Sequence, residues 1–264
     1  MFAPMFAVFV ACNGVKTEAT GISLKPQVRK NLKWFAFAWF VPTLLTAAGA
    51  VLYFAVFRDK LDLSFGYLVK AYQALGMEVK DGVVQSMTVK DGEPQGMAVA
   101  GIAYISIMQC FTHAPLINAI AAVGEEFGWR GYLTPKLTSV FGKKKAMLIS
   151  GVIWGIWHAP AIWLLGYEYG TGYAGYPVTG ILMFCIVTVS VGIILSWLYE
   201  KTESIWTAAV FHGAFNAAAT LPMVFTDGTM KHYLLGPSPN GLIAGIPVFA
   251  LAALIFLKET KEEK

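Results

Sequence analysis

Residues 96–124 read GMAVAGIAYISIMQCFTHAPLINAIAAVG and contain no charged side chain, and the next six residues are Glu125-Glu126-Phe127-Gly128-Trp129-Arg130. This uncharged run is longer than the roughly 20 residues that a helix needs to cross the hydrocarbon core of a bilayer. Ionisable side chains at such a position are costly, and they are by default candidates for function. The stretch therefore predicts a membrane protein with a functional site where this segment ends.

The composition of the whole chain agrees with a membrane protein. Of 264 residues, 56% are hydrophobic and 14% are charged, whereas about 25% of residues are charged in an ordinary soluble domain. With the run at 96–124, the uncharged runs predict an all-α, polytopic helical membrane protein of about seven to eight transmembrane helices, folded as a single integral-membrane domain over residues 1–264. The other runs are Met1–Gly14, Trp34–Phe57, Ala146–Tyr167, Tyr169–Tyr199, Ser204–Thr226 and His232–Leu257.

The distribution of Lys and Arg predicts the orientation, because basic residues near the ends of spans stay in the cytoplasm. Segments 15–33 and 125–145 each carry five basic residues, whereas segment 168–177 carries none. This alternation places the C-terminus in the cytoplasm and residues 58–95 in an extracytoplasmic loop. We therefore expect a multi-pass protein of the cell membrane with its site opening to the cytoplasm. The net charge of +4 reflects the same bias, so the expected surroundings are lipid and not nucleic acid.

Three segments outside the expected spans have their own patterns. Two Asp-Gly pairs, at 81–82 and 91–92, flank an alternating run at 83–89, which predicts a small hairpin or surface strand. Apolar residues at helical spacing over Asp59–Gly76 predict an amphipathic helix on the outer leaflet. Residues Trp129–Phe141, interrupted by a proline, predict an interfacial or re-entrant helix.

The acidic pair after the long run divides into one paired and one free carboxylate. On a helix, Glu126 and Arg130 are four residues apart and meet on one face, whereas Glu125 points about 100° away. Glu125, which lacks that partner, is a candidate general base. The alternative is that both acids simply extend to the membrane interface.

Two histidines lie inside other apolar runs. His158 stands in Trp-His-Ala-Pro, and a neutral imidazole there could accept a proton, hold a water or bind a metal, or it could be a core histidine bonded to a backbone carbonyl. His212 and Asn216 are again four residues apart. Their side chains could stabilise an oxyanion, although polar residues on a span also join helices to one another.

The remaining reactive side chains suggest no chemistry. His113 stands in a second His-Ala-Pro sequence, and we assign it no role. His232 is expected in an outer loop, in contact with solvent. Cys12, Cys110 and Cys185 lie in apolar runs at unrelated spacings and are interpreted as inert buried thiols.

Taken together, Glu-Glu-x-x-x-Arg at 125–130, Trp-His-Ala-Pro at 157–160 and Phe-His-Gly-x-x-Asn at 211–216 resemble one family. In this order and on separate segments they are similar to the CPBP intramembrane proteases, which include type II CAAX prenyl endopeptidases and bacteriocin-processing or self-immunity proteins. The resemblance covers about residues 98–220, the expected protease core. It implies these roles: Glu125 as general base, His158 as its partner on the water, His212 and Asn216 as oxyanion donors, and Glu126 and Arg130 as braces of the site.

The resemblance leaves the metal open, because the family is also labelled metalloprotease. Glu125, His158 and His212 could form a Glu-His-His zinc site with an open position for water. The chain has no His-Glu-x-x-His sequence, and both the base and the ligand roles would fall on few residues. We therefore expect a glutamate mechanism without a metal or cofactor, with zinc at these three residues as the alternative.

Four functions remain as hypotheses. The first is an endopeptidase that cuts near the C-terminus of a membrane-anchored substrate, prenylated or not. The second is a bacteriocin-processing or self-immunity protease of the same fold, with an unprenylated substrate. The third is a proton-coupled transporter, which predicts internal repeats, but the duplicated His-Ala-Pro is too short to count as one. The fourth is a catalytically inactive adaptor, against which the presence of all four candidate catalytic residues argues.

The charge alternation predicts the result of a labelling experiment. A cysteine that replaces Lys144 should react with an impermeant thiol reagent only from the cytoplasmic side, and one that replaces Asp81 only from outside. The measurement is labelling of intact cells against inverted vesicles, in a background without the three natural cysteines. The opposite pattern would reverse the predicted orientation.

Overall fold

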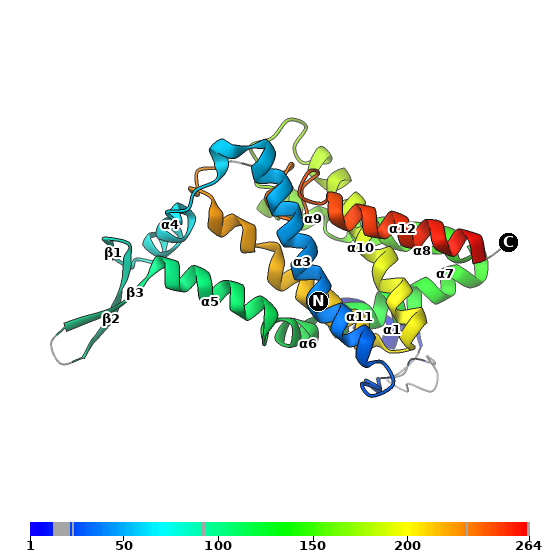
Figure 1. Cartoon of the computed structure of the whole chain (residues 1–264). Helices are drawn as coiled ribbons and strands as arrows, with labels where there is room; N and C mark the ends of the chain where they lie inside the picture. Colours follow the sequence, from blue (N-terminus) through cyan, green and yellow to red (C-terminus); the bar gives the residue numbers. More distant parts are fainter. Residues whose placement is uncertain (13–21, 23, 91–92, 231, 263–264) are drawn as a thin grey trace.

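The computed structural model describes residues 1–12, 22, 24–90, 93–230 and 232–262, which fold almost entirely into helices (Figure 1). A small sheet stands at one end of the molecule, and the C-terminus lies at the other. The helices are α1 (Ala3–Ala11), α3 (Leu32–Val56), α4 (Gly66–Ala74), α5 (Val99–Phe111), α6 (Ala114–Glu126), α7 (Thr134–Phe141), α8 (Lys143–Trp157), α9 (Ala159–Leu165), α10 (Val178–Thr202), α11 (Ile205–Ala219) and α12 (Ile246–Glu262), with short 3₁₀ turns η1 (Arg58–Lys60) and η3 (Leu221–Phe225) and a π-helical segment η2 (Phe127–Leu133).

The all-α, polytopic membrane fold is confirmed, but the number of spans is not. Among the described residues, four helical stretches are long and apolar enough to cross a bilayer: Leu32–Val56, Lys143–Leu165, Val178–Thr202 and Ile205–Phe225. A fifth arises if Val99–Phe111 and Ala114–Phe141, bent by 56° at their junction, count as one span. The expected seven to eight helices are therefore not supported by length and composition alone.

Local chemistry explains why three uncharged runs do not form single spans. The run at 96–124 breaks after α5, and α6 restarts with Pro115 in its first turn, where the missing N–H of proline costs no helical hydrogen bond. Among the described residues of the first run, 1–12, the nine residues of α1 are helical. The last run becomes helical only from Ile246, so α12 has 17 residues and ends among charged side chains.

Helix α11 is the centre of the fold, with α6 and α3 packed against it (Figure 1). Gly213 allows the approach of α6, because a Cβ at this position would lie 2.5 Å from the Ala119 nitrogen and 2.6 Å from the Pro115 oxygen. Helix α10 packs against α8 in the same manner, since a Cβ on Gly151 would lie 2.5 Å from the Val189 Cα. Small residues thus bring the backbones together, as is common in membrane helices.

The expected hairpin is present at the far end of α5. Strands β1 (Val79–Lys80), β2 (Val83–Lys90) and β3 (Glu93–Ala98) form an antiparallel sheet in that order. Between β1 and β2, Asp81 and Gly82 have φ values of 50° and 74°, and positive φ at both central residues is typical of a type I′ turn. The second Asp-Gly pair, at 91–92, lies outside the described residues.

The amphipathic helix expected over Asp59–Gly76 is shorter than the sequence predicts. Helix α4 begins only at Gly66, because the Asp62 carboxylate accepts hydrogen bonds from the backbone N–H groups of Ser64 and Gly66. These bonds lower the pKa of Asp62, the largest cause being the hydrogen bond from the Ser64 side chain. They favour a turn in place of the first helical turns.

The close approach of α11 and α6 predicts a difference between two glycine substitutions. Gly213→Ala should lower the thermal unfolding temperature in detergent, because overpacking against backbone typically costs about 1–3 kcal/mol. Gly101→Ala is the matched control, since its Cβ would meet only the Met97 side chain at 3.8 Å. Equal unfolding temperatures for both variants would contradict the packing described for α11.

Candidate active site

A cavity of about 490 Å³ contains the side chains that the sequence singles out for catalysis. Its lining includes Glu125, His158, His212 and Asn216, which come from the end of α6, the junction of α8 and α9, and α11. Three segments that are far apart in the sequence thus contribute side chains to one space. The proposed braces, Glu126 and Arg130, do not line the cavity and lie buried next to it.

The acidic pair is positioned by an irregular helix. Helix α6 ends at Glu126 and continues as the buried π-helical segment η2, then as α7, which has Pro135 in its first turn. π-Helical turns often occur at functional sites. The helix expected over Trp129–Phe141 thus follows α6 without a break in the helical path. Pro135 lies in the first turn of α7 and does not interrupt a helix.

Glu125 is held by neutral donors. Its side chain is 4% exposed, and its Oε2 accepts hydrogen bonds from the Trp154 indole nitrogen at 2.8 Å and the Trp129 indole nitrogen at 3.4 Å. The described part of the chain places no Lys or Arg in an ion pair with it. The sequence analysis missed both tryptophans, although Trp129 follows Glu125 by the same four residues that separate Glu126 from Arg130.

Glu126 lies at the centre of a buried charged cluster. Its Oε1 accepts hydrogen bonds from Arg130 Nη1 at 3.1 Å and from His212 Nδ1 at 2.8 Å. The Arg130 guanidinium also lies 4.4 Å from the centre of the Trp154 ring, a cation–π contact. The ion pair expected from the four-residue spacing is therefore present, and it additionally holds His212.

One ring nitrogen of His158 is free to accept a hydrogen bond from a molecule in the cavity. Its Nδ1 lies 2.9 Å from the Trp154 carbonyl oxygen, and since a carbonyl only accepts, Nδ1 carries the proton and Nε2 of the neutral ring is an acceptor. The ring stacks on Tyr167, with centroids 6.0 Å apart, and contacts Phe184 edge-on at 4.8 Å. These contacts fix the imidazole in one orientation.

Asn216 borders two cavities. It lies one turn after His212 on α11 and also lines a second cavity of about 410 Å³, together with Ser106, Gln109 and Asn118. Within the described ranges its side-chain amide has no hydrogen-bond partner, so the amide is available to a bound group.

The three residues considered for zinc do not present a ready ligand set. Glu125 uses Oε2 for two indole hydrogen bonds and His212 uses Nδ1 for Glu126, so Glu125 Oε1 and the histidine Nε2 atoms are the atoms that would be open to a metal. Across the described residues, no group of three His, Cys, Asp or Glu side chains has a geometry that could hold a metal ion. The metal-free mechanism stays a prediction that needs its own test.

The other reactive residues lie away from this cavity. His113 is exposed at the start of α6, and His232 is exposed where it pairs with Gly170 in an isolated bridge. Of the three free cysteines, only Cys110 is buried, and Cys12 and Cys185 are partly exposed. The interpretation as buried thiols is therefore wrong for these two.

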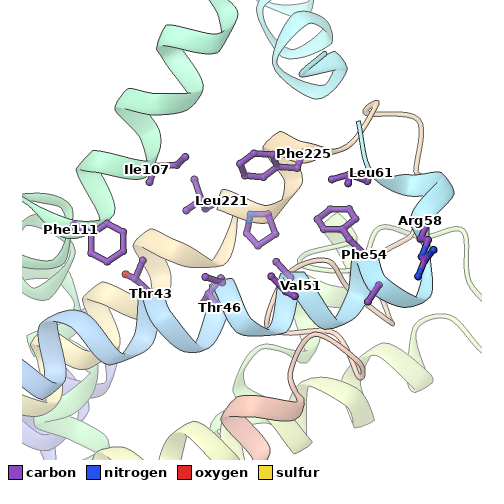
Figure 2. A pocket seen from close by; sticks show the side chains of 14 residues that line it. Thr43, Thr46, Val51, Phe54, Arg58, Leu61, Ile107, Phe111, Leu221 and Phe225 are labelled. Atoms are coloured by element: carbon purple, nitrogen blue, oxygen red, sulfur yellow. The ribbon is translucent and has the colours of Figure 1, made fainter. Parts of the chain in front are cut away.

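A larger cavity, of about 740 Å³, is a different space between α3, α5 and η3. Figure 2 shows apolar side chains from these elements facing one another, among them Phe54, Phe111 and Phe225, with Arg58 at the far end. Arg58 is its one ionisable lining residue, and a guanidinium always stays protonated. This cavity therefore offers no group that could activate water.

The lining of the smaller cavity bears on orientation. It includes Tyr167 and Glu168, in the loop after α9, and Asn240, in the segment before α12. Charge alternation assigns segment 168–177 to the outside, opposite the basic residues at 143–145. A cavity that opened beside this loop would therefore open to the outside of the cell. This conflicts with the cytoplasmic opening that the sequence analysis expects. The orientation of the protein stays a prediction.

Known proteins resemble the part of the chain that holds this cavity. Residues 96–218 match the family model described as type II CAAX prenyl endopeptidase Rce1-like. The protein "CAAX prenyl protease 2" of Methanococcus maripaludis is 33% identical over 112 residues, which are 41% of this chain and 40% of that relative. The chain therefore spans less than half the length of this relative. No solved structure matches significantly. Residues 96–218, which contain all three motifs, are therefore the part of the chain that is similar to type II CAAX prenyl endopeptidases.

Proposed function

We propose that this protein is an intramembrane endopeptidase that hydrolyses a peptide bond near the C-terminus of a membrane-anchored, prenylated substrate. The observation that carries the proposal is the shared cavity of Glu125, His158, His212 and Asn216. The site combines a carboxylate without a cationic partner, an imidazole with a free acceptor nitrogen and two groups that can face an oxyanion. The name of the relative, which specifies a CAAX prenyl protease, supports the substrate class.

The reaction needs one water between Glu125 and His158. Glu125 removes a proton from this water, His158 Nε2 accepts its second hydrogen bond, and the resulting hydroxide attacks the peptide carbonyl carbon. The carbonyl oxygen becomes an oxyanion that Asn216 and His212 stabilise. As the C–N bond breaks, Glu125 gives the proton to the leaving nitrogen, so the products are a carboxylic acid and an amine.

The charged cluster explains how His212 could act as a donor. Its Nδ1 proton faces Glu126, so a neutral ring would have no proton on Nε2 and could only accept there. Glu125 and Glu126 together carry two negative charges and Arg130 carries one positive charge. A second proton on His212 would make this buried group neutral, and buried charges require such compensation. Glu126 and Arg130 then act as positioning residues for His212.

The alternatives receive less support. Both matched descriptions specify CAAX endopeptidases, which favours this activity over bacteriocin processing or self-immunity. A proton-coupled transporter would use the same buried carboxylates and histidines, but it gives no reason for Asn216 beside His212. An inactive adaptor would give no reason for Glu125 to line a cavity.

Substitutions in the catalytic set should differ in severity. Glu125→Gln should abolish cleavage of a farnesylated CAAX peptide in detergent, because the amide cannot take the proton of water, and His158→Ala should have nearly the same effect. Asn216→Ala should leave measurable turnover, since loss of one oxyanion donor typically costs about 10²–10³ in kcat. Glu203→Gln, at an exposed ion pair with Lys30, is the control. Turnover of Glu125→Gln close to that of the wild type would refute the general-base role.

Treatment with a chelator should distinguish the two mechanisms. With Glu125 as base and no zinc, activity should survive prolonged incubation with a strong chelator, and the purified protein should contain far less than one zinc per chain. Metal content and peptide cleavage are measured on the same samples. Stoichiometric zinc, with activity lost on chelation and restored by zinc alone, would instead support the Glu-His-His alternative.

A further inference from the structure

The cavity wall carries a second carboxylate that the proposed reaction does not use. Glu168 lies in the loop Gly166-Tyr167-Glu168-Tyr169-Gly170, between α9 and α10, and lines the same cavity as Glu125 and His158. It is partly exposed, so a bound molecule could reach it. None of the three motifs includes it.

Buried neighbours hold this carboxylate in place. The Asn240 side-chain nitrogen donates to Glu168 Oε2 at 2.6 Å, and Asn240 itself is 4% exposed. The Tyr169 hydroxyl donates to the Asn240 backbone oxygen at 2.9 Å. Glu168 is thus held by a buried side chain that is itself fixed, and it is not a freely rotating surface acid.

The backbone adds a second constraint. Glu168 has φ 63°, and Gly166 and Gly170 have φ 62° and 69°. A non-glycine residue with positive φ is uncommon, and it persists where the surrounding structure holds it. The loop therefore keeps Glu168 at the cavity wall at a conformational cost.

This carboxylate has no cation. The described residues place no Lys, Arg or His within ion-pair distance of Glu168, and no Lys or Arg is among the residues that line the cavity. Glu125 adds a second carboxylate to the same wall. A carboxylate only accepts hydrogen bonds when ionised, so Glu168 is complementary to a positively charged donor such as the side chain of Lys or Arg.

Tyr167 links this position to the reacting groups. Its ring stacks on the His158 imidazole, and Glu168 is the next residue in the chain. A side chain bound at Glu168 would therefore share one cavity with the histidine that orients the water. This places the bound side chain close to the scissile bond.

We propose that Glu168 is a specificity residue that binds a Lys or Arg side chain of the peptide substrate, at a position near the bond that is cut. The inference rests on the proposed endopeptidase activity and adds a charge preference to it. Asn240 acts as a positioning residue for Glu168.

The test uses sets of three farnesylated CAAX peptides. The peptides of one set differ at a single position, which is Lys, Gln or Glu, and one set is made for each position within a few residues of the cleaved bond. At one position the wild type should cleave the Lys peptide with about 10- to 100-fold higher kcat/KM than the Glu peptide, as expected for one charge-assisted hydrogen bond. Most of the difference should lie in KM.

Two variants and one control separate this role from a structural one. Glu168→Gln should reduce the Lys-to-Glu ratio to near one, and Glu168→Lys should invert it. The Lys-to-Glu ratio within each variant does not depend on how much of the protein is folded. If Glu168→Lys does not fold, the ratio measured for Glu168→Gln is sufficient to test the role of Glu168. Glu78→Lys makes the same change of charge at an exposed position outside the cavity and should leave the ratio unchanged.

The outcomes distinguish the inference from the activity on which it rests. If the wild type cleaves all peptides with equal efficiency at every position, the specificity role is wrong and the endopeptidase activity stands. A ratio that persists in Glu168→Gln also overturns the role. If the wild type cleaves none of the peptides, the proposed function itself fails.

Discussion

The buried ion pair between Glu126 and Arg130 is the interaction on which the site depends. Both side chains are at most 1% exposed, and removing one partner of such a pair typically costs about 3–5 kcal/mol because the other charge is left buried. Glu126 also holds His212 from α11, so the pair ties the end of α6 to the central helix. Loss of Arg130 would therefore disturb the packing of the helices as well as the electrostatics of the cavity.

The sequence could predict this pair because its chemistry is local. Glu126 and Arg130 are one helical turn apart, and a spacing of four residues is enough to bring them together. The hairpin at 79–98 was predictable for the same reason, since its Asp-Gly turn imposes positive φ on two adjacent residues. The shared cavity of Glu125, His158, His212 and Asn216 was anticipated only through the resemblance of the motifs to a known family.

The number of spans could not be read from uncharged runs. An uncharged run indicates that a segment is compatible with lipid or with a packed interior, but it does not indicate where a helix ends. The bend between α5 and α6 and the late start of α12 depend on proline, turn geometry and tertiary contacts. Glu168 was missed for a related reason, because its bond to Asn240 joins positions 72 residues apart, and no sequence period connects them.

Trp154 connects groups that the motifs treat as separate. Its indole nitrogen binds Glu125, its ring face covers Arg130, its backbone oxygen holds His158, and its ring contacts His212 edge-on at 5.2 Å. A change of ionisation at any one of these groups alters the field at the indole. In a variant in which the other seven tryptophans are replaced, the emission of Trp154 would report on substrate entry without an added label.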